Sequence, residues 1–441
     1  MSLVFYAWGE PKFVLVMIGA IVFNYAMAIL IDRLRQKKNL AKTALIICIA
    51  GNLGLLFIYK YLDFFINNIN LFGFNLPFQN LLLPIGLSFF TFQAMSYVID
   101  VYRGDVSVQK KPQDIGLYIS FFPQLVAGPI IRYKTIKDQI ASRSVDFELF
   151  SEGVRRFIIG FSKKIIIANN MALIANKAFD LPDAGRSVLF AWIGAVAYAF
   201  QILFDFSGYS DMAIGLGKMF GFHFPENFNY PYISKSISEF WQRWHMSLGQ
   251  WFRDYVYFPL GGSRTKTKSR LVFNLLIVWL LTGVWHGASW NFICWGLLYF
   301  ILIAFEKVTG YPKNFKLKSA VVGYRVLTLL FVLGGWVLFR ADGLRAAVRY
   351  GLSMFGMRGN SVFCDNVILV FREYWVFLVA AVLCSTELFK WLKRVCMENA
   401  KSKGVRLAAN TISVAFYILC FFWSISYLIL GAHNPFIYFN F

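Results

Sequence analysis

Residues 271–305 read LVFNLLIVWLLTGVWHGASWNFICWGLLYFILIAF and contain no Lys, Arg, Asp or Glu. A helix needs about 20 mainly apolar residues to cross the hydrocarbon core of a bilayer, and this stretch exceeds that length. One imidazole, that of His286, lies inside it, in the local sequence TGVWHGASWN of residues 282–291. Ionisable side chains in spanning segments usually face a bundle interior or a watery cavity, so His286 is a candidate functional residue.

The composition of the whole chain agrees with a membrane protein. Of 441 residues, 58% are hydrophobic and 15% are charged, and the mean hydropathy is +0.56. Helices satisfy their own backbone hydrogen bonds in lipid, and no polar/apolar alternation typical of spanning strands is present. We therefore predict an all-α, polytopic membrane protein. Further apolar segments of spanning length are residues 13–31, 188–206, 321–339 and 407–430.

The positive charge follows the connecting segments. The net charge is +21, from 44 Lys and Arg against 23 Asp and Glu, and a positive-inside bias explains it better than nucleic-acid binding. Spans at residues 13–31, 43–65 and 81–101 would place residues 67–80 outside. Residues 340–349 are basic where this alternation requires an outer loop, so the topology beyond residue 321 stays open.

Two segments differ from simple spans. Residues 146–164 place apolar and charged side chains on different helical faces, which predicts an interfacial helix. Residues 121–129 read FFPQLVAGP, and their prolines and glycine predict a re-entrant element, because broken helices at membrane depth must lie beside protein or a cavity.

Residues 236–258 predict a single amphipathic helix. Ser236 and Glu239 have the spacing of a capping box, which marks a helix start. At 100° per residue, His245 falls at the margin of the apolar arc, where it can point into a protein interior. His245 is therefore the second candidate site residue. The apolar arc comprises Phe240, Trp244, Leu248, Trp251, Phe252 and Tyr255.

The cysteines carry no metal signature. The six are scattered singly, without the paired spacing of a zinc site or a disulfide framework. We expect no metal site, and the abundance of aromatic residues needs only packing and interfacial belts to explain it.

Several motifs together resemble the membrane-bound O-acyltransferase family. The sequence PLGGSR at residues 259–264 is more similar to the alginate O-acetyltransferase branch than to the teichoic-acid D-alanyl-transfer branch. The other motifs are WHMSL at 244–248, WFRDYVY at 251–257, VWHG at 284–287, FFPQLVAGPI at 121–130, FDFSGYSD at 204–211, FNYP at 228–231 and NPFIY at 434–438.

The resemblance implies one transmembrane domain over residues 1–441, with a catalytic region at about residues 200–306. It also implies about ten or eleven spanning helices, with re-entrant and interfacial helices, around a central tunnel. The branch usually carries another apolar segment before the motif at residues 5–10. A truncated or alternatively started chain, lacking the family's N-terminal helix, would account for this difference.

The resemblance further implies acyl transfer from a thioester donor to a hydroxyl, with a histidine at the position of His286. A positioned imidazole that takes the proton of a weakly nucleophilic alcohol contributes about 10²- to 10⁴-fold. Burial favours the neutral imidazole, the form able to act as a base. His286 is thus the predicted general base, while His245 is predicted to orient the donor or to help stabilise the oxyanion. No motif for an acyl-enzyme is present, which favours direct transfer.

Other residues near these motifs are candidates for substrate binding. For Asp205 and Asp211 the alternative role is pairing with a basic side chain, because buried acids must find partners. For the histidines the alternatives are packing of helices within the membrane and anchoring at its interface. The candidates are Trp285, Asn291, Trp244, Arg243, Asp205 and Asp211.

The resulting hypothesis is an O-acetyltransferase of a bacterial inner membrane that acts on a cell-envelope polysaccharide. It would use acetyl-CoA or another cytoplasmic acyl thioester, hold no tightly bound cofactor, bind no nucleic acid, and deliver acetyl groups through an extracytoplasmic partner protein. Alternatives are D-alanyl or other acyl transfer to teichoic acid or peptidoglycan, a secondary transporter, and a non-catalytic assembly subunit.

Overall fold

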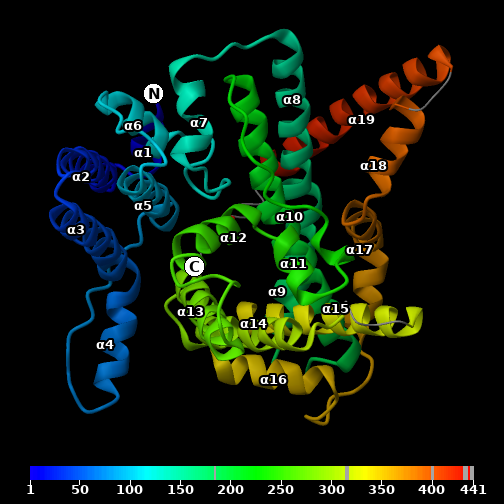
Figure 1. The fold of residues 1–441 in the computed structure, drawn as a ribbon. Coiled ribbons are helices and arrows are strands. Elements are labelled where there is room, and N and C mark those ends of the chain that lie inside the picture. The colour runs from blue at the N-terminus through cyan, green and yellow to red at the C-terminus, as the bar shows by residue number, and fades with distance from the viewer. Residues whose placement is uncertain (183–184, 313–316, 399–401, 431–435, 438–441) are drawn as a thin grey trace. The chain divides into compact units, whose positions relative to one another are not determined.

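The computed structural model describes residues 1–182, 185–312, 317–398, 402–430 and 436–437. Helices account for all regular structure in these ranges, as the sequence predicts (Figure 1). Residues 434, 435 and 438 of the NPFIY motif lie outside the described residues.

The first half of the chain contains helices of different lengths, from 8 residues in α1 to 32 residues in α10. They are α1 (Ser2–Gly9), α2 (Val14–Arg33), α3 (Lys38–Leu56), the π-helical turn η1 (Phe57–Tyr61), α4 (Leu62–Asn70), α5 (Leu87–Arg103), α6 (Pro112–Ser120), α7 (Tyr133–Ala141), α8 (Phe147–Ser162), η2 (Lys163–Ala168), α9 (Asn169–Asp180) and α10 (Val188–Met219).

The second half continues in the same way. Its elements are the short turn η4 (Pro231–Ile233), α11 (Ile237–Arg243), α12 (Met246–Phe252), η5 (Arg253–Tyr257), α13 (Lys268–His286), α14 (Trp290–Thr309), α15 (Lys318–Arg340), α16 (Leu344–Met354), α17 (Asp365–Cys384), α18 (Leu388–Lys393), η6 (Arg394–Glu398) and α19 (Lys403–Ile429).

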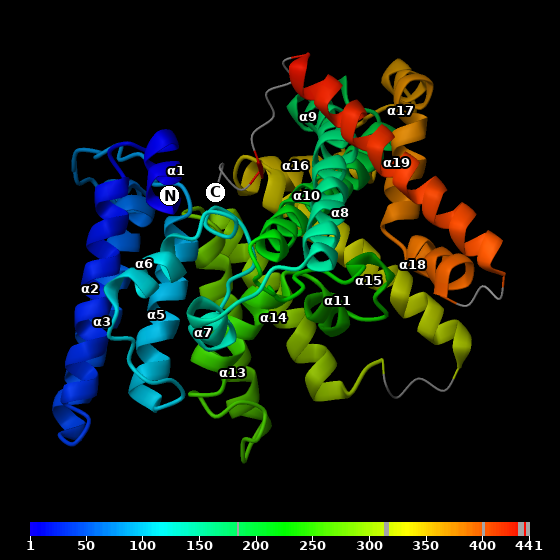
Figure 2. The same cartoon turned by 90° about the horizontal axis from the view of Figure 1, so that it is seen from above.

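The helices form two compact units that interleave along the sequence. The first unit comprises Met1–Val154, Ala213–Pro225 and Gln250–Leu260, and the second comprises Arg155–Met212, Glu226–Gly249 and the described residues from Gly261 onward. In the first unit, α2 and α3 lie side by side (Figures 1 and 2). The buried amides of Asn24 and Asn52 exchange hydrogen bonds of 3.0 and 2.9 Å between them, a typical way of joining helices in lipid.

Nine helical segments in the described ranges are long and apolar enough to cross a membrane. They confirm a polytopic all-α protein, although the resemblance implied ten or eleven. The segment expected to span at residues 81–101 differs, because Pro84 and Gly86 precede the helix and α5 begins only at Leu87. The nine segments are α2, α3 with η1 and α4, α8 with η2 and α9, α10, α13, α14, α15, α17 and α19.

The helix predicted at residues 146–164 is present, but its predicted end is wrong. The helix continues without a break from α8 through η2 into α9, and it ends at Asp180. No glycine or proline interrupts it after Lys164, and the apolar run Ile165–Ile167 is buried. This segment therefore packs in the second unit as part of a helix of spanning length.

Residues 121–129 form the irregular segment that their prolines and glycine predict. Leu125 and Ala127 are buried without helical structure. The Gln124 side chain donates a 2.8 Å hydrogen bond to the carbonyl of Tyr118. Gly86 has φ +75°, and a Cβ there would lie 2.6 Å from the carbonyl oxygen of Leu125. Only glycine permits this approach, and protein encloses the broken backbone. The re-entrant position of this segment in the membrane stays a prediction.

Candidate functional site

The apolar stretch at residues 271–305 forms two antiparallel helices, α13 and α14, that pack backbone against backbone. A Cβ on Gly283 would lie 2.5 Å from the carbonyl oxygen of Phe292, and one on Gly296 would lie 2.4 Å from that of Trp279. These distances exclude any larger residue without movement of the backbone. The glycine contact brings the two helices together at the level where the chain turns after His286.

His286 is the last residue of α13 and is 6% exposed. Three aromatic rings surround its imidazole, with centroid distances of 5.0 Å to Trp285, 4.9 Å to Trp295 and 5.3 Å to Phe339. The carbonyl end of a helix favours a positive charge, so the end of α13 stabilises a proton gained by this ring. The walls come from α13, α14 and α15 and hold the imidazole in one place.

The sequence predicts one helix over residues 236–258, but the structure has two, and His245 lies in the break between them. The helix begins as predicted, with Ser236 Oγ accepting a 3.1 Å hydrogen bond from the amide of Glu239. It ends at Arg243, however, and α12 begins at Met246. His245 has φ +44°, a left-handed conformation that is strained for a residue other than glycine.

The break has a tertiary cause. The amide of Asn229 donates to the carbonyl of Arg243 at 2.9 Å, and the amide of Met246 donates to the carbonyl of Asn227 at 2.9 Å. The loop that contains Asn227 and Asn229 thus forms hydrogen bonds with backbone groups on both sides of the break. The helical wheel drawn through residues 236–258 is therefore wrong beyond Arg243.

Asn227 orients His245, and no motif or spacing in the sequence predicts this role. Its side chain is fully buried, with Oδ1 3.2 Å from His245 Nδ1. The backbone N–H of Ser247, which can only donate, also points to this Oδ1 at 3.2 Å. Oδ1 is therefore the acceptor, and neutral His245 carries its proton on Nδ1 and its lone pair on Nε2.

Both histidine rings lie close to the indole of Trp285. Ring centroids are 6.0 Å apart between His245 and Trp285, and 5.0 Å apart between Trp285 and His286. Phe206 of α10 packs edge-on against His245 at 4.6 Å. Two buried imidazoles thus lie against one aromatic ring. A positioned imidazole can take the proton of a hydroxyl, as transfer of an acyl group to that hydroxyl requires.

Comparison with known proteins identifies the family of this chain. The sequence model of MBOAT, the membrane-bound O-acyltransferase family, matches residues 111–344. The chain belongs to the membrane-bound O-acyltransferase family. It is an O-acyltransferase and an integral membrane protein, and it acts on an acyl donor.

Curated bacterial relatives of this O-acyltransferase include two probable alginate O-acetylases. That of Pseudomonas aeruginosa is 43% identical, covering 80% of this chain and 68% of its own. That of Pseudomonas putida is 38% identical, covering 100% of this chain and 93% of its own. The peptidoglycan O-acetyltransferase of Helicobacter pylori is 36% identical, covering 82% of this chain and 73% of its own.

Trp244 and Trp285 lie in the aromatic cluster around the two candidate histidines. Trp285 lies close to both histidines, and Trp244 lies 4.8 Å from Trp336 by ring centroids. Trp336 lies 5.7 Å from Phe339, which in turn contacts His286. The structure therefore brings both tryptophans near the histidines.

Arg243 and Asn291 make contacts that stabilise the scaffold. Arg243 donates to Glu239 at 3.0 Å and to the carbonyl of Asn229 at 3.2 Å, which fixes the loop beside the break. Asn291 Nδ2 donates to the carbonyl of Ala341 at 3.1 Å and joins the start of α14 to the end of α15. Both side chains support the elements that carry the histidines.

The two acids of α10 are engaged in ion pairs. Asp205 pairs with Lys164 and accepts a 2.8 Å hydrogen bond from the amide of Ile437. Asp211 lies 2.6 Å from both Arg156 and Lys163. Asp205 is next to Phe206, so its pair steadies the helix whose aromatic ring contacts His245. Within the described ranges, no group of three or more His, Cys, Asp or Glu residues could hold a metal ion.

Proposed function

We propose that this O-acyltransferase transfers an acetyl group from a cytoplasmic thioester, such as acetyl-CoA, to a hydroxyl of a cell-envelope polysaccharide. The observation that carries the proposal is the pair of buried imidazoles, His245 and His286, both of which lie against Trp285. The names of the alginate and peptidoglycan O-acetylating relatives support an acetyl group and a glycan acceptor.

His286 serves as the general base in this proposal. It takes the proton of the acceptor hydroxyl as the oxygen attacks the thioester carbonyl carbon, the C–S bond then breaks, and the departing thiolate takes up that proton. The end of α13 favours the imidazolium formed between these steps. Base catalysis of this kind is worth about 10²- to 10⁴-fold. No covalent acyl-enzyme is required.

His245 binds a substrate group in this proposal. Its Nδ1–H is directed at Asn227, so Nε2 presents a lone pair. A lone pair accepts a hydrogen bond from an O–H or N–H group, whereas stabilising an oxyanion needs a donor. This favours orientation of the acceptor hydroxyl or of an amide in the donor over an oxyanion role.

The cellular setting completes the proposal. Residues 1–441 would act as one transmembrane domain in a bacterial inner membrane, with a tunnel that admits donor and acceptor from opposite sides. An extracytoplasmic partner protein would finish delivery to the glycan, and no tightly bound cofactor and no nucleic acid would be involved. Peptidoglycan and teichoic acid are the alternative acceptors, with D-alanyl the alternative acyl group.

The test is the ester content of isolated glycans from cells with the wild-type gene, without it, and with His286→Ala. We expect loss of acetyl esters from one envelope polymer in both mutant strains. Unchanged esters on every polymer would refute the pathway. If His286→Ala leaves acetyl transfer intact, His286 is not the general base of this proposal.

A further inference from the structure

Glu306 of α14 is a buried acid that directly follows the apolar stretch 271–305. It is 4% exposed, and among the described residues its carboxylate forms three hydrogen bonds and no ion pair. Its Oε1 accepts the amide of Ile237 at 2.7 Å and the hydroxyl of Tyr324 at 3.0 Å. Its Oε2 accepts the amide of Ser238 at 2.8 Å. Because a buried charge is costly unless it is compensated, these three donors determine where the carboxylate lies.

Glu306 holds the first turn of α11. That helix has only 7 residues, a length at which a helix has little stability of its own. The first backbone N–H groups of a helix have no partner within it, and Glu306 supplies the acceptor for those of Ile237 and Ser238. The carboxylate also lies at the helix end that favours a negative charge. Contacts with neighbouring elements therefore set the position of α11.

The other end of α11 leads into His245. The helix ends at Arg243, two residues before His245, and the loop that contains Asn227 and Asn229 holds this end. The 7 residues of the helix span about 10 Å at 1.5 Å per residue. A helix this short moves as one piece, so a shift at its first turn also displaces its last. The orientation of His245 thus depends on the attachments at both ends of α11.

Glu306 also joins the helices that surround His286. It shares α14 with Trp295, whose ring centroid lies 4.9 Å from that of His286. At about 100° per residue, Trp295 and Glu306 lie about 20° apart around the helix and so share one face of it. Tyr324, which bonds to Glu306, belongs to α15, and α15 also carries Phe339 beside His286. One carboxylate therefore links the helix that precedes His245 to two helices that surround His286.

We propose that Glu306 is a positioning residue that fixes α11 and, through α11, the imidazole of His245. This inference rests on the proposed role of His245 in binding a substrate group. Glu306 acts at a distance, because its carboxylate bonds to the end of α11 that lies away from His245. Without these bonds α11 would shift against α14, and His245 would lose its fixed place relative to His286.

The test is hydrogen–deuterium exchange of the full chain in detergent, compared between the wild type and Glu306→Gln. The glutamine oxygen can accept one backbone N–H, but its NH₂ group opposes the other. We expect exchange to rise about fivefold or more at residues 237–238 and also at residues 246–247, whose amides donate to Asn227. Faster exchange confined to the first turn of α11 would overturn the proposal. Glu306→Asp, shorter by one methylene group, weakens the same bonds and replaces Glu306→Gln if that variant does not fold.

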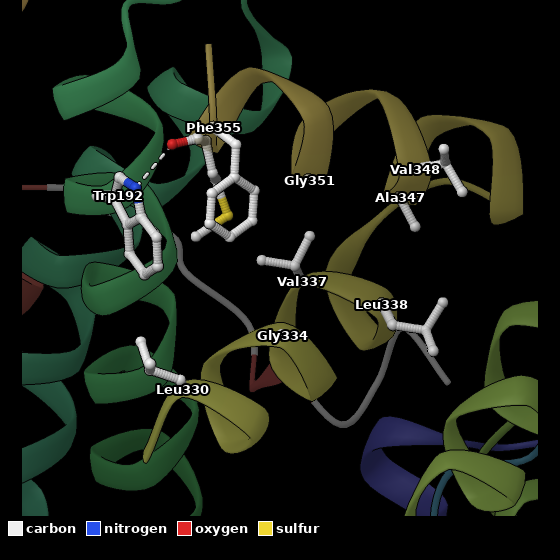
Figure 3. A pocket seen from close by; sticks show the side chains of 10 residues that line it. Trp192, Leu330, Gly334, Val337, Leu338, Ala347, Val348, Gly351 and Phe355 are labelled. Atoms are coloured by element: carbon white, nitrogen blue, oxygen red, sulfur yellow. Dashed lines mark hydrogen bonds between the residues drawn. The ribbon is translucent and has the colours of Figure 1, made fainter. Parts of the chain in front are cut away.

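Two control variants separate positioning from a general loss of stability. Tyr324→Phe removes one hydrogen bond from the same carboxylate but leaves both bonds to α11. Trp192→Phe removes a 2.8 Å hydrogen bond to the carbonyl of Met354, beside an apolar groove among α10, α15 and α16 (Figure 3). Both variants should lower the thermal midpoint while exchange at residues 246–247 stays as in the wild type. Equally fast exchange there in both controls would refute a specific role for the bonds between Glu306 and α11.

Steady-state kinetics tests the link to the reaction. Glu306→Gln is expected to lower kcat about tenfold with a smaller change in KM, since a misplacement of about 1 Å can cost about 10²-fold. In a His245→Gln background the same substitution should lower kcat by no more than about twofold, because the imidazole that Glu306 positions is absent. A tenfold loss in both backgrounds would contradict the proposal. If His245→Gln alone keeps the wild-type rate, the proposed role of His245 fails, and exchange at residues 246–247 still decides whether Glu306 positions this segment.

Discussion

Asn227 Oδ1 lies 3.2 Å from His245 Nδ1 and thereby decides which nitrogen of that imidazole carries the proton. The same oxygen accepts the Ser247 hydroxyl at 2.9 Å, while Asn227 Nδ2 donates to Ser210 at 3.0 Å. A single buried amide thus links α10 to the break between α11 and α12. The left-handed conformation of His245 persists because these bonds over-determine it.

Replacing Asn227 with alanine is expected to lower kcat about a hundredfold with a smaller change in KM, because the imidazole loses its fixed orientation. Ser247→Ala removes one partner of Asn227 but keeps its contact with His245, and it serves as the control. Steady-state kinetics on the purified protein in detergent gives both constants. Equal effects of the two variants on kcat would argue against an orienting role for Asn227.

Replacing His286 with alanine is expected to lower the rate of acyl transfer by about 10²- to 10⁴-fold, because the hydroxyl loses its proton acceptor. His223→Ala makes the same change at an exposed position and should leave the rate unchanged. Release of free thiol from an acyl thioester measures the rate. A near-normal rate in folded His286→Ala protein would remove His286 from the reaction.

The pair formed by Lys164 and Asp205 is buried, with side-chain exposures of 5% and 3%. Asp205→Leu removes the carboxylate that pairs with the buried Lys164 and is expected to cost about 3–5 kcal/mol of stability. Adding Lys164→Met should recover most of that loss. Thermal unfolding in detergent measures both changes.

The control for this ion pair is the exposed pair of Arg35 and Asp32, whose side chains are 48% and 38% exposed. Asp32→Leu should change stability by less than about 1 kcal/mol, because solvent screens such a pair. A comparable loss of stability in Asp205→Leu and Asp32→Leu would show that burial does not determine how much these ion pairs contribute to stability.

Replacing glycine with alanine is expected to have opposite effects on stability at Gly296 and at Gly323. Gly296→Ala places a Cβ 2.4 Å from the carbonyl oxygen of Trp279 and is expected to destabilise the protein by about 1–3 kcal/mol. Gly323→Ala meets open space and should stabilise it by about 0.4–1 kcal/mol through reduced freedom of the unfolded chain. Thermal midpoints of the two variants that shift in the same direction would contradict the close packing of α13 and α14.

Burial lowers the pKa of His245 from 6.5 to about 3. The unfolded chain binds a proton below about pH 6.5 that the folded protein excludes, so this contribution to stability is present above pH 6.5 and is lost as the pH falls toward 3. The loss should approach about 1.4 kcal/mol per pH unit. His245→Gln should flatten the dependence of the unfolding midpoint between pH 6.5 and 4.5, and parallel curves would exclude the imidazole as its source.

Much of the architecture could be predicted from local patterns. The apolar segments at residues 13–31, 321–339 and 407–430 became α2, α15 and α19 with ends shifted by a few residues. The capping-box spacing of Ser236 and Glu239 located the start of α11. These helices and this cap depend on residues that are close in sequence, and they can therefore be predicted from local sequence patterns.

The errors lie where distant segments compete for the same backbone groups. The helix predicted over residues 236–258 breaks because the loop containing Asn227 and Asn229 bonds to its backbone. The helix expected to end at Lys164 continues, since Asp205 on α10 supplies the partner that allows this lysine to be buried. Neither interaction has a signal in the local sequence.

The amino-acid sequence by itself determined a helical membrane protein and marked both histidines, because hydrophobic length and the cost of an ionisable group in lipid are properties of a single segment. Only the tertiary structure decided that His245 lies against Trp285 beside His286, that Asn227 fixes the proton of His245, and that Asp205 and Asp211 belong to ion pairs. The physical reason is that a hydrogen bond or ring contact depends on the relative position of two elements, and packing of the whole unit sets that position.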